Sequence, residues 1–312
     1  MLGTPVWIWV GFSVLLVFLL GVDLALFHRR AHRVELKEAL LETAAWIGAA
    51  LAFNACIYFW YGPATAVEFL TGYLIEKALS VDNIFVILVI FQAFRIPAKL
   101  QHRVLYYGVL GALVMRGIFV AAGVKLLDAF HPVLYVFGAI LLAAGIRMIF
   151  PQRRNSRMET NWAVKIAGKF LPSSEDFHDE KFLVRREGKW VATPLFLALV
   201  TVEAADIFFA VDSVPAVLAI TRNAFIVFSS NAFAILGMRA LYFALAGLLP
   251  KFRFLHQGLA LLLIVVGVKM ILNQWVEIPD MASLGIVAGV LGATVGASMI
   301  WPGKRGQAKA AE

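Results

Sequence analysis

Charged side chains are scarce in this chain of 312 residues: only 15% are Asp, Glu, Lys or Arg, whereas 61% are hydrophobic. Soluble domains usually carry about 25% charged residues, so the composition excludes an ordinary soluble protein. The apolar residues gather in runs of about 20, the length that crosses a hydrocarbon core of ~30 Å as a helix. The sequence therefore predicts an all-α, multi-pass membrane protein.

Cysteine is almost absent, and histidine is rare. The single cysteine, Cys56, excludes an intrachain disulfide, and its apolar neighbours in the sequence predict a core residue. An intramembrane hydrolase would need a nucleophile or a histidine-rich metal centre inside a span. The histidines fall instead in loops or at span edges, at His28, His32, His102, His131, His178 and His256. We therefore expect no enzymatic activity and no permanently bound cofactor.

The net charge of +8 does not indicate a nucleic-acid partner, because the basic residues do not gather on one soluble surface. They collect in alternate loops between the apolar runs, which marks those loops as cytoplasmic. The first run lacks a basic start and a small-residue cleavage site, so we expect a span and not a signal peptide. The pattern predicts an outside N-terminus, a cytoplasmic C-terminus and about nine spans, at 6–27, 44–61, 67–94, 104–127, 133–150, 194–220, 225–249, 258–272 and 283–301.

Two acidic stretches lie deep inside apolar runs, where carboxylates cost free energy and usually mark a functional site. In each, an acidic residue is followed six positions later by an aspartate and then by a small polar residue. The two sets are Glu76, Asp82 and Asn83 in the third span, and Asp206, Asp212 and Ser213 in the sixth.

These stretches belong to a longer internal match, in which 70–82 aligns with 200–212. Each stretch is followed by a span with one arginine, Arg116 or Arg239, and then by a span with a basic end. Three spans are an odd number, so the second copy enters the membrane from the opposite face, as in the inverted repeats of secondary transporters. Within a single transmembrane domain, 1–312, we expect one repeat at 64–150, a cytoplasmic loop at 151–193 and a second repeat at 194–273.

The spacing and residue types indicate a site for a hard cation. Residues six apart on a helix point about 120° away from each other, so one ion needs a broken helix or partners from the other repeat. Pro215 indicates such a break, because it leaves the carbonyl of Val211 without its helical partner. Carboxylate, carbonyl and hydroxyl oxygens favour Mg²⁺, Ca²⁺ or Mn²⁺ over Zn²⁺ or Cu⁺. The expected ligands are Glu76, Asp82, Asn83, Asp206, Asp212 and Ser213.

Two facing acidic pairs bring up to four negative charges into a low-dielectric site, where they must hold protons, a cation or basic side chains. Exchange of protons and metal on the same carboxylates would give an antiport mechanism. The alternative is a structural network in which Arg116 and Arg239 neutralise the acids. We favour the ion site, because intramembrane carboxylates usually mark ion or proton paths.

Three smaller features complete the expectations. Asp23, near the end of the first span, is either an interfacial residue paired with Arg29 or Arg30, or a group that faces the bundle interior. Residues 34–42 are expected to form an amphipathic approach to the second span. In the long polar loop, 182–191 predicts a small hairpin around Glu187 and Gly188, outside the seat of the chemistry.

Four motifs resemble the TerC/Alx family of bacterial membrane proteins, and the resemblance covers almost the whole chain. They are FLTGYLIEK at 69–77, SVDN at 80–83, FFAVDSVPA at 208–216 and SNAFAILGMRALYF at 230–243. The end of the long loop, 182–194, is similar to the Alx branch in particular.

The resemblance implies a manganese exporter in the bacterial inner membrane, responsive to alkaline pH in the Alx branch and historically labelled as tellurium resistance. The intramembrane acids of the family match Glu76, Asp82, Asp206 and Asp212. Glu203 also matches, and Asp23 is implied as an accessory group.

The main hypothesis is a secondary transporter that exports a divalent cation, most readily Mn²⁺, in exchange for protons across the lipid bilayer. Accessory or proton-carrying roles are expected for Asp23, Glu203, Arg116, Arg239 and Asn231. The alternative is a membrane-anchored assembly or stress-resistance factor, of the tellurite type, whose acids are structural. The oligomeric state stays open.

Overall fold

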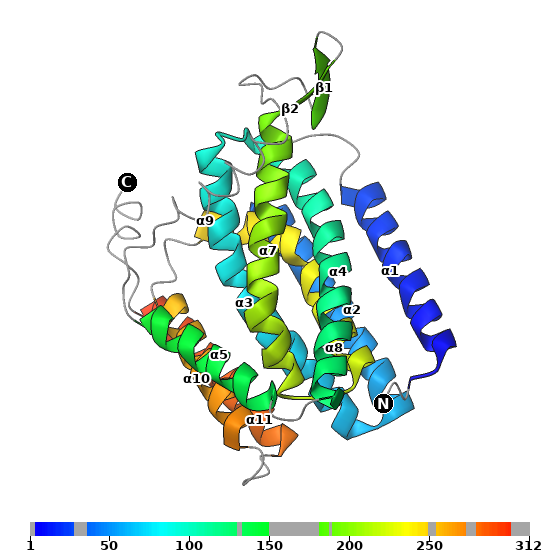
Figure 1. Cartoon of the computed structure of the whole chain (residues 1–312), viewed down its shortest axis with the longest axis vertical. Helices are drawn as coiled ribbons and strands as arrows, with labels where there is room; N and C mark the ends of the chain where they lie inside the picture. The colour runs from blue at the N-terminus through cyan, green and yellow to red at the C-terminus, as the bar shows by residue number, and fades with distance from the viewer. Residues whose placement is uncertain are drawn as a thin grey trace.

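The computed structural model describes residues 4–27, 36–129, 133–149, 181–186, 189–248, 254–272 and 279–300. Nearly all of them are helical, which confirms the all-α prediction (Figure 1). The helices are α1 (Val6–Phe27), α2 (Leu36–Tyr61), α3 (Pro63–Ala93), α4 (Ala98–Ala129), α5 (Val133–Ile149), α7 (Pro194–Leu218), α8 (Ala224–Leu236), α9 (Met238–Leu248), α10 (Leu255–Leu272) and α11 (Asp280–Ile300).

Several of these helices have the length and composition of membrane spans. Within the described residues, α1, α2, α4, α7 and α11 are each long and apolar enough to cross a membrane, and α8 with α9 adds a sixth if the bent pair counts as one span. Helix α3 has 31 residues but carries Glu76, Lys77 and Asp82 in its middle, while α5 and α10 are shorter apolar helices. The multi-pass class is thus supported, whereas the number of nine spans and their direction stay predictions.

The centre of the molecule is a bundle of α3, α4, α7 and α8, which pack against one another. Helices α3 and α7 run antiparallel: Gly72 early in α3 lies against Val217 near the end of α7, and Glu76 and Ser213 share one nitrogen of Arg116. An antiparallel pair is what an inverted repeat requires of these two helices, but the repeat as a whole stays a prediction.

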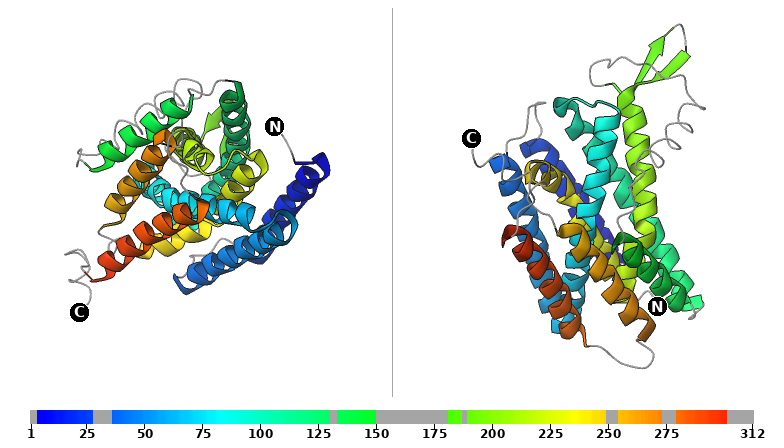
Figure 2. Two further views of the ribbon diagram at one scale, coloured as in Figure 1. Left: turned by 90° about the horizontal axis from the view of Figure 1, so that it is seen from below. Right: turned by 90° about the vertical axis from the view of Figure 1, so that its left-hand side faces the viewer.

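Helices α5 and α10 pack closely through glycines. Gly138 of α5 lies against Gly267 of α10, and Gly145 lies against Ala260 and Ile264, so these two helices also run antiparallel. A Cβ added at Gly267 would lie 2.9 Å from the carbonyl oxygen of Gly138. Small residues allow this approach of the two backbones, as they do between other membrane helices. Figure 2 shows the pair at one edge of the molecule, with α1 and α2 at the other.

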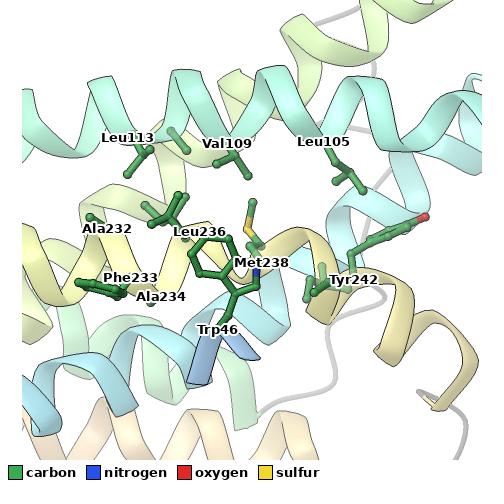
Figure 3. Close-up of a cluster of buried hydrophobic side chains, with 14 of the residues drawn as sticks. Trp46, Leu105, Val109, Leu113, Ala232, Phe233, Ala234, Leu236, Met238 and Tyr242 are labelled. Atoms are coloured by element: carbon green, nitrogen blue, oxygen red, sulfur yellow. The ribbon is translucent and has the colours of Figure 1, made fainter. Parts of the chain in front are cut away.

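Aromatic side chains attach α1 and α2 to the central bundle. Phe12 of α1 packs on Phe53 of α2 with ring centroids 5.4 Å apart, and Phe53 packs on Phe233 of α8 at 4.8 Å. Such pairs contribute about 0.5–1.5 kcal/mol beyond their buried area. Further along, Trp46 packs among residues of α4, α8 and α9 (Figure 3). The aromatic residues thus bind the two N-terminal helices to α8.

Two predictions about the helices are wrong, one on where a helix begins and one on where a helix is broken. The expected approach 34–42 is not separate from the second span, because α2 is one helix from Leu36 to Tyr61. The break expected at Pro215 is also absent, since α7 continues through this proline as an α-helix. The seventh span is broken instead: α8 ends before Gly237, α9 begins after it, and their axes differ by 42°.

The predicted hairpin is confirmed. Strand β1 (Leu183–Arg186) pairs antiparallel with β2 (Lys189–Ala192), with Leu183 opposite Ala192 and Arg186 opposite Lys189. The Thr193 hydroxyl donates hydrogen bonds to the carbonyl oxygens of Lys181 and Phe182, at 2.8 and 2.9 Å, where the hairpin joins α7. The turn residues Glu187 and Gly188, and 151–180 of the expected loop, lie outside the described residues.

Cys56 is exposed on α2, so the prediction of a core residue is wrong. Its helix presents other large apolar side chains outward, including Phe59 and Trp60. The outer surface of a membrane protein is apolar because its solvent is lipid, so an apolar sequence around Cys56 did not distinguish core from surface.

Candidate functional site

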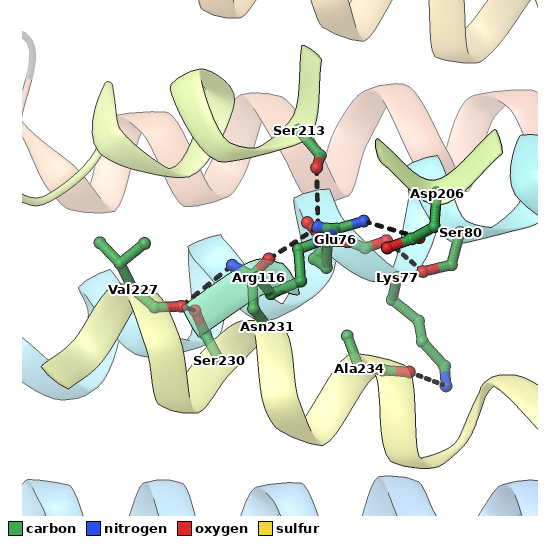
Figure 4. A network of polar contacts seen from close by, with 10 residues as sticks. All are labelled: Glu76, Lys77, Ser80, Arg116, Asp206, Ser213, Val227, Ser230, Asn231 and Ala234. Atoms are coloured by element: carbon green, nitrogen blue, oxygen red, sulfur yellow. Dashed lines mark hydrogen bonds and ion pairs between the residues drawn. The ribbon is translucent and has the colours of Figure 1, made fainter. Parts of the chain in front are cut away.

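Arg116 is the centre of a buried polar cluster (Figure 4). It lies in the middle of α4, with 1% of its side chain exposed. Its Nη1 donates to Oε1 of Glu76 on α3, to Oγ of Ser213 on α7 at 2.7 Å and to Oδ1 of Asn231 on α8 at 2.8 Å. One guanidinium therefore joins the three other helices of the central bundle.

The second acidic stretch reaches the same arginine. Oδ1 of Asp206 lies 3.5 Å from Nη2 of Arg116, in an ion pair that is almost fully buried. The two acidic stretches predicted to face each other, 76–83 and 206–213, are thus brought together around Arg116. The prediction that the two stretches meet is confirmed for Glu76, Asp206 and Ser213, whereas their position near the membrane midplane stays a prediction.

Hydrogen bonds to backbone carbonyl oxygens orient the polar side chains in and beside this cluster. Asn231 donates from Nδ2 to the carbonyl oxygen of Val227 at 2.9 Å, which turns its amide oxygen toward Arg116. Ser80 and Ser230 donate to backbone carbonyl oxygens on their own helices, Glu76 O at 2.8 Å and Val227 O at 3.1 Å. The polar residues of α3 and α8 are therefore held in place by their own helices.

The charges of the cluster do not balance. Arg116 supplies one positive charge, whereas Glu76 and Asp206 supply two negative charges when both are ionised. Among the described residues, Oε2 of Glu76 and Oδ2 of Asp206 have no hydrogen-bond partner. Burying an uncompensated ion costs several kcal/mol. The cluster therefore has the capacity to take up one further cation or proton, with two free carboxylate oxygens to receive it.

The side chains of Asp82 and Asp212 lie outside the described part of the structure, although their backbones lie in α3 and α7. Asp212 directly precedes Ser213, which contacts Arg116. Asp82 follows Glu76 by about 9 Å along α3, at 1.5 Å per residue. Asn83 is buried.

The metal prediction is not tested by these contacts. Among the side chains that the structure describes, no three from His, Cys, Asp and Glu gather closely enough to hold a metal ion. Asp82 and Asp212, two of the expected ligands, are not among those side chains. The ligand set therefore stays a prediction, and the described part supplies Glu76, Asp206 and Ser213.

The sequence left open that Arg239 neutralises the acids of the two repeats. In the structure Arg239 instead forms a second cluster with other acids. Its Nη2 lies 2.6 Å from Oδ2 of Asp23 on α1 and 3.2 Å from Oε1 of Glu42 on α2. Asp23 therefore faces the bundle interior, which was one of the two predicted alternatives, and not the membrane interface. Glu42 was missed, because it stood at the end of a segment read as an approach outside the membrane.

Two further groups lie near the helices of the site. Glu203, a predicted accessory residue, is half-buried against α4, where a Cβ on Gly111 would lie 2.2 Å from its carboxylate oxygens. Lys77, which the sequence did not single out, donates from Nζ to the carbonyl oxygen of Ala234 near the end of α8, at 3.3 Å. The sequence could have identified Lys77, because a basic residue inside an apolar run needs a hydrogen-bond acceptor.

The chain is similar to known membrane proteins over most of its length. The pattern of the integral membrane protein TerC family matches residues 61–306. An uncharacterized membrane protein of Myxococcus xanthus is 46% identical over 298 residues, with 96% of this chain and 93% of the relative covered. A protein of Escherichia coli K12 named "Putative membrane-bound redox modulator Alx" is 44% identical over 299 residues, covering 93% of this chain and 92% of the relative.

A membrane protein of Rickettsia bellii is 37% identical over 292 residues and covers 94% of this chain and 97% of the relative. No solved structure matches the chain. The match over most of the length, together with the identities to full-length relatives, shows that the chain belongs to the TerC family of integral membrane proteins.

Proposed function

We propose that the protein is a secondary transporter that exports a divalent metal cation, most readily Mn²⁺, from the cytoplasm of a bacterium across its inner membrane. The observation that carries the proposal is the meeting of two acidic stretches, from α3 and α7, around a single buried arginine. Carboxylates inside a membrane bundle usually mark an ion or proton path. Their oxygen chemistry suits Mn²⁺ and other hard cations.

In this proposal the cation competes with Arg116 for the carboxylates. Oε2 of Glu76 and Oδ2 of Asp206 are the oxygens without a partner in the described structure, so they are available to an incoming ion or proton. Ser213 adds a neutral oxygen, and Asp82 and Asp212 would supply further negative charge from positions along the same helices. When the cation leaves, Arg116 and protons neutralise the acids again.

The antiparallel packing of α3 on α7 supports alternating access to such a site. In transporters with inverted repeats, the binding site lies at the interface of the repeats, and one repeat rocks against the other. Arg116 contacts helices that belong to both expected repeats. A cation held there would lie at the interface whose rearrangement opens it to either side.

Reconstitution of the purified protein in liposomes tests the proposal. We expect Mn²⁺ to cross the membrane faster than in empty liposomes, and a proton gradient directed oppositely to the metal to accelerate it. Mg²⁺ and Ca²⁺, measured in the same way, show the preference among hard cations. Asp82→Asn and Asp212→Asn should each lower the Mn²⁺ rate at least tenfold, because each removes a charge that the cation needs.

Glu68→Gln is the matched control, because Glu68 lies on α3 about two turns before Glu76 and outside the cluster. It should transport at the rate of the unmodified protein. Equal Mn²⁺ rates in Asp82→Asn and the unmodified protein, with both inserted in the membrane, would contradict the metal site.

A second candidate is a membrane-anchored assembly or stress-resistance factor with structural acids. The engagement of Arg116 by both Glu76 and Asp206 favours it, because the arginine already neutralises half of their charge. The relatives named as a redox modulator raise a related role, but a chain whose one cysteine is Cys56 has no intrachain dithiol. This candidate predicts partner proteins that copurify and no metal flux in liposomes.

A further inference from the structure

Asp23, Glu42 and Arg239 form a cluster on other helices than the Arg116 cluster. Like that cluster, it contains two carboxylates and one guanidinium. Asp23 comes from α1, Glu42 from α2 and Arg239 from α9, so the predicted repeats contribute one of its three residues. At most 7% of any of these side chains is exposed. The cluster is therefore a second site at which two carboxylates share one buried arginine.

In this cluster one negative charge is not compensated, and two buried polar atoms have no hydrogen-bond partner. Both carboxylates approach the same nitrogen, Nη2 of Arg239, at 2.6 Å from Asp23 and 3.2 Å from Glu42. Within the described part of the chain, Oδ1 of Asp23 and Nη1 of Arg239 have no hydrogen-bond partner. With both acids ionised, the cluster carries one uncompensated negative charge, which costs several kcal/mol when buried.

We propose that Asp23, Glu42 and Arg239 form a proton-binding site, in which the two carboxyl groups hold one shared proton. A proton removes the excess charge and needs no additional space. A metal cation fits less well, because the guanidinium beside both carboxylates repels it and two acids alone supply few ligands. The site is distinct from the metal site proposed above and does not depend on it.

Other polar groups near α9 are engaged elsewhere. Lys77 of α3 donates to Ala234 O, and Tyr242 of α9 donates to Gln101 of α4 at 2.9 Å. In the described structure neither group forms a hydrogen bond or ion pair with Asp23, Glu42 or Arg239. The remaining acid on α2, Glu38, has interactions of its own. Among the described residues, Arg239 is the basic side chain that pairs with these two acids, and a proton would balance the second carboxylate.

Infrared spectroscopy of the purified protein in lipid tests the proposal, because a protonated carboxyl group absorbs apart from the carboxylate and shifts in deuterated water. We expect Asp23→Asn and Glu42→Gln each to remove the same part of the carboxyl absorption at neutral pH. The double variant should remove no more than either single variant, because the pair holds one proton. An unchanged absorption in both single variants, or twice the loss in the double variant, would overturn the proposal.

Glu38→Gln, one turn before Glu42 on α2, is the control and should leave the carboxyl absorption unchanged; an equal loss there would also overturn the proposal. Glu76→Gln combined with Glu42→Gln should give the sum of the separate changes, because the two clusters share no residue. An amide has the shape of a protonated carboxyl group, so both single variants should fold. If neither folds, both charges are needed, and the shared proton is excluded.

Discussion

Arg116 and Arg239 occupy corresponding positions in the expected repeats, yet their acidic partners come from different parts of the chain. Arg116 contacts Glu76 and Asp206, one acid from each repeat. Arg239 contacts Asp23 and Glu42, which precede both repeats. The same residue type in the same place thus joins the repeats to each other in one case and to the N-terminal helices in the other.

Replacing Arg116 should destabilise the protein strongly. Arg116→Met leaves Glu76 and Asp206 buried without a counter-charge, which costs about 3–5 kcal/mol when one member of a buried pair is removed. Thermal unfolding in detergent should show the loss, and Glu76→Gln in the same chain should restore part of it. Lys125→Met, at an exposed position of α4, should leave the unfolding temperature unchanged. Equal stability of both variants would show that Arg116 does not neutralise these acids.

Residue patterns predicted the central cluster better than the second one. Glu76, Asp206, Ser213 and Arg116 stood out because each is polar inside a long apolar run and has a counterpart in the other repeat. Glu42 has no such counterpart, and it lies where apolar and polar sequence meet. Its burial depends on α2 beginning at Leu36, several residues before the apolar run, and on packing with α1 and α9 that the sequence alone does not contain.

At the scale of the helices, the break lies where a small residue allows close packing. Gly237 lies so near its neighbours that a Cβ would be 2.7 Å from Nζ of Lys77 and 3.0 Å from Cβ of Trp46. Lys77 in turn binds a carbonyl oxygen near the C-terminal end of α8, where the helix dipole favours a positive charge. Pro215 causes no break, because it removes a single hydrogen bond from a helix that is buried around it.

Enlarging a glycine between α5 and α10 should cost stability. Gly267→Ala places a Cβ 2.9 Å from Gly138 O, a backbone atom that cannot move aside alone. Overpacking of this kind costs about 1–3 kcal/mol. Thermal unfolding in detergent should show the loss, whereas Gly285→Ala in α11, where nothing lies within 4 Å, should match or exceed the unmodified protein. A stable Gly267→Ala variant would contradict the close approach of these helices.

Helix boundaries followed from the sequence wherever an apolar run ends abruptly. The sixth span was expected at 194–220, and the structure has Pro194–Leu218; the first was expected from residue 6, and α1 begins at Val6. The bend at Gly237 did not follow, because glycine is common in membrane helices and by itself indicates no break. Close packing does not predict it either, because Gly267 is packed about as tightly and lies within the single helix α10.

For the whole molecule, the direction of the chain across the membrane is the prediction that most needs a measurement. The distribution of basic residues places the C-terminus in the cytoplasm and the loop between α10 and α11 outside. A fluorescent protein, which folds in the cytoplasm, should be bright when fused after residue 312. An alkaline phosphatase inserted at 273–278 should be active outside. The same side for both reporters would contradict a crossing of the membrane by α11.

Helices α8 and α9 form one bent rod whose two arms touch different clusters. Asn231 on α8 accepts a hydrogen bond from Arg116, and Arg239 on α9 binds Asp23 and Glu42. A change in this bend, which is 42° in the structure, would move Arg239 relative to Asn231 and so change the separation of the two clusters. Linkage then has to be reciprocal: if a proton at the second cluster changes the cation affinity of the first, the cation changes the proton affinity of the second by the same factor. The bent pair of helices would then couple proton binding at the second cluster to cation release at the first.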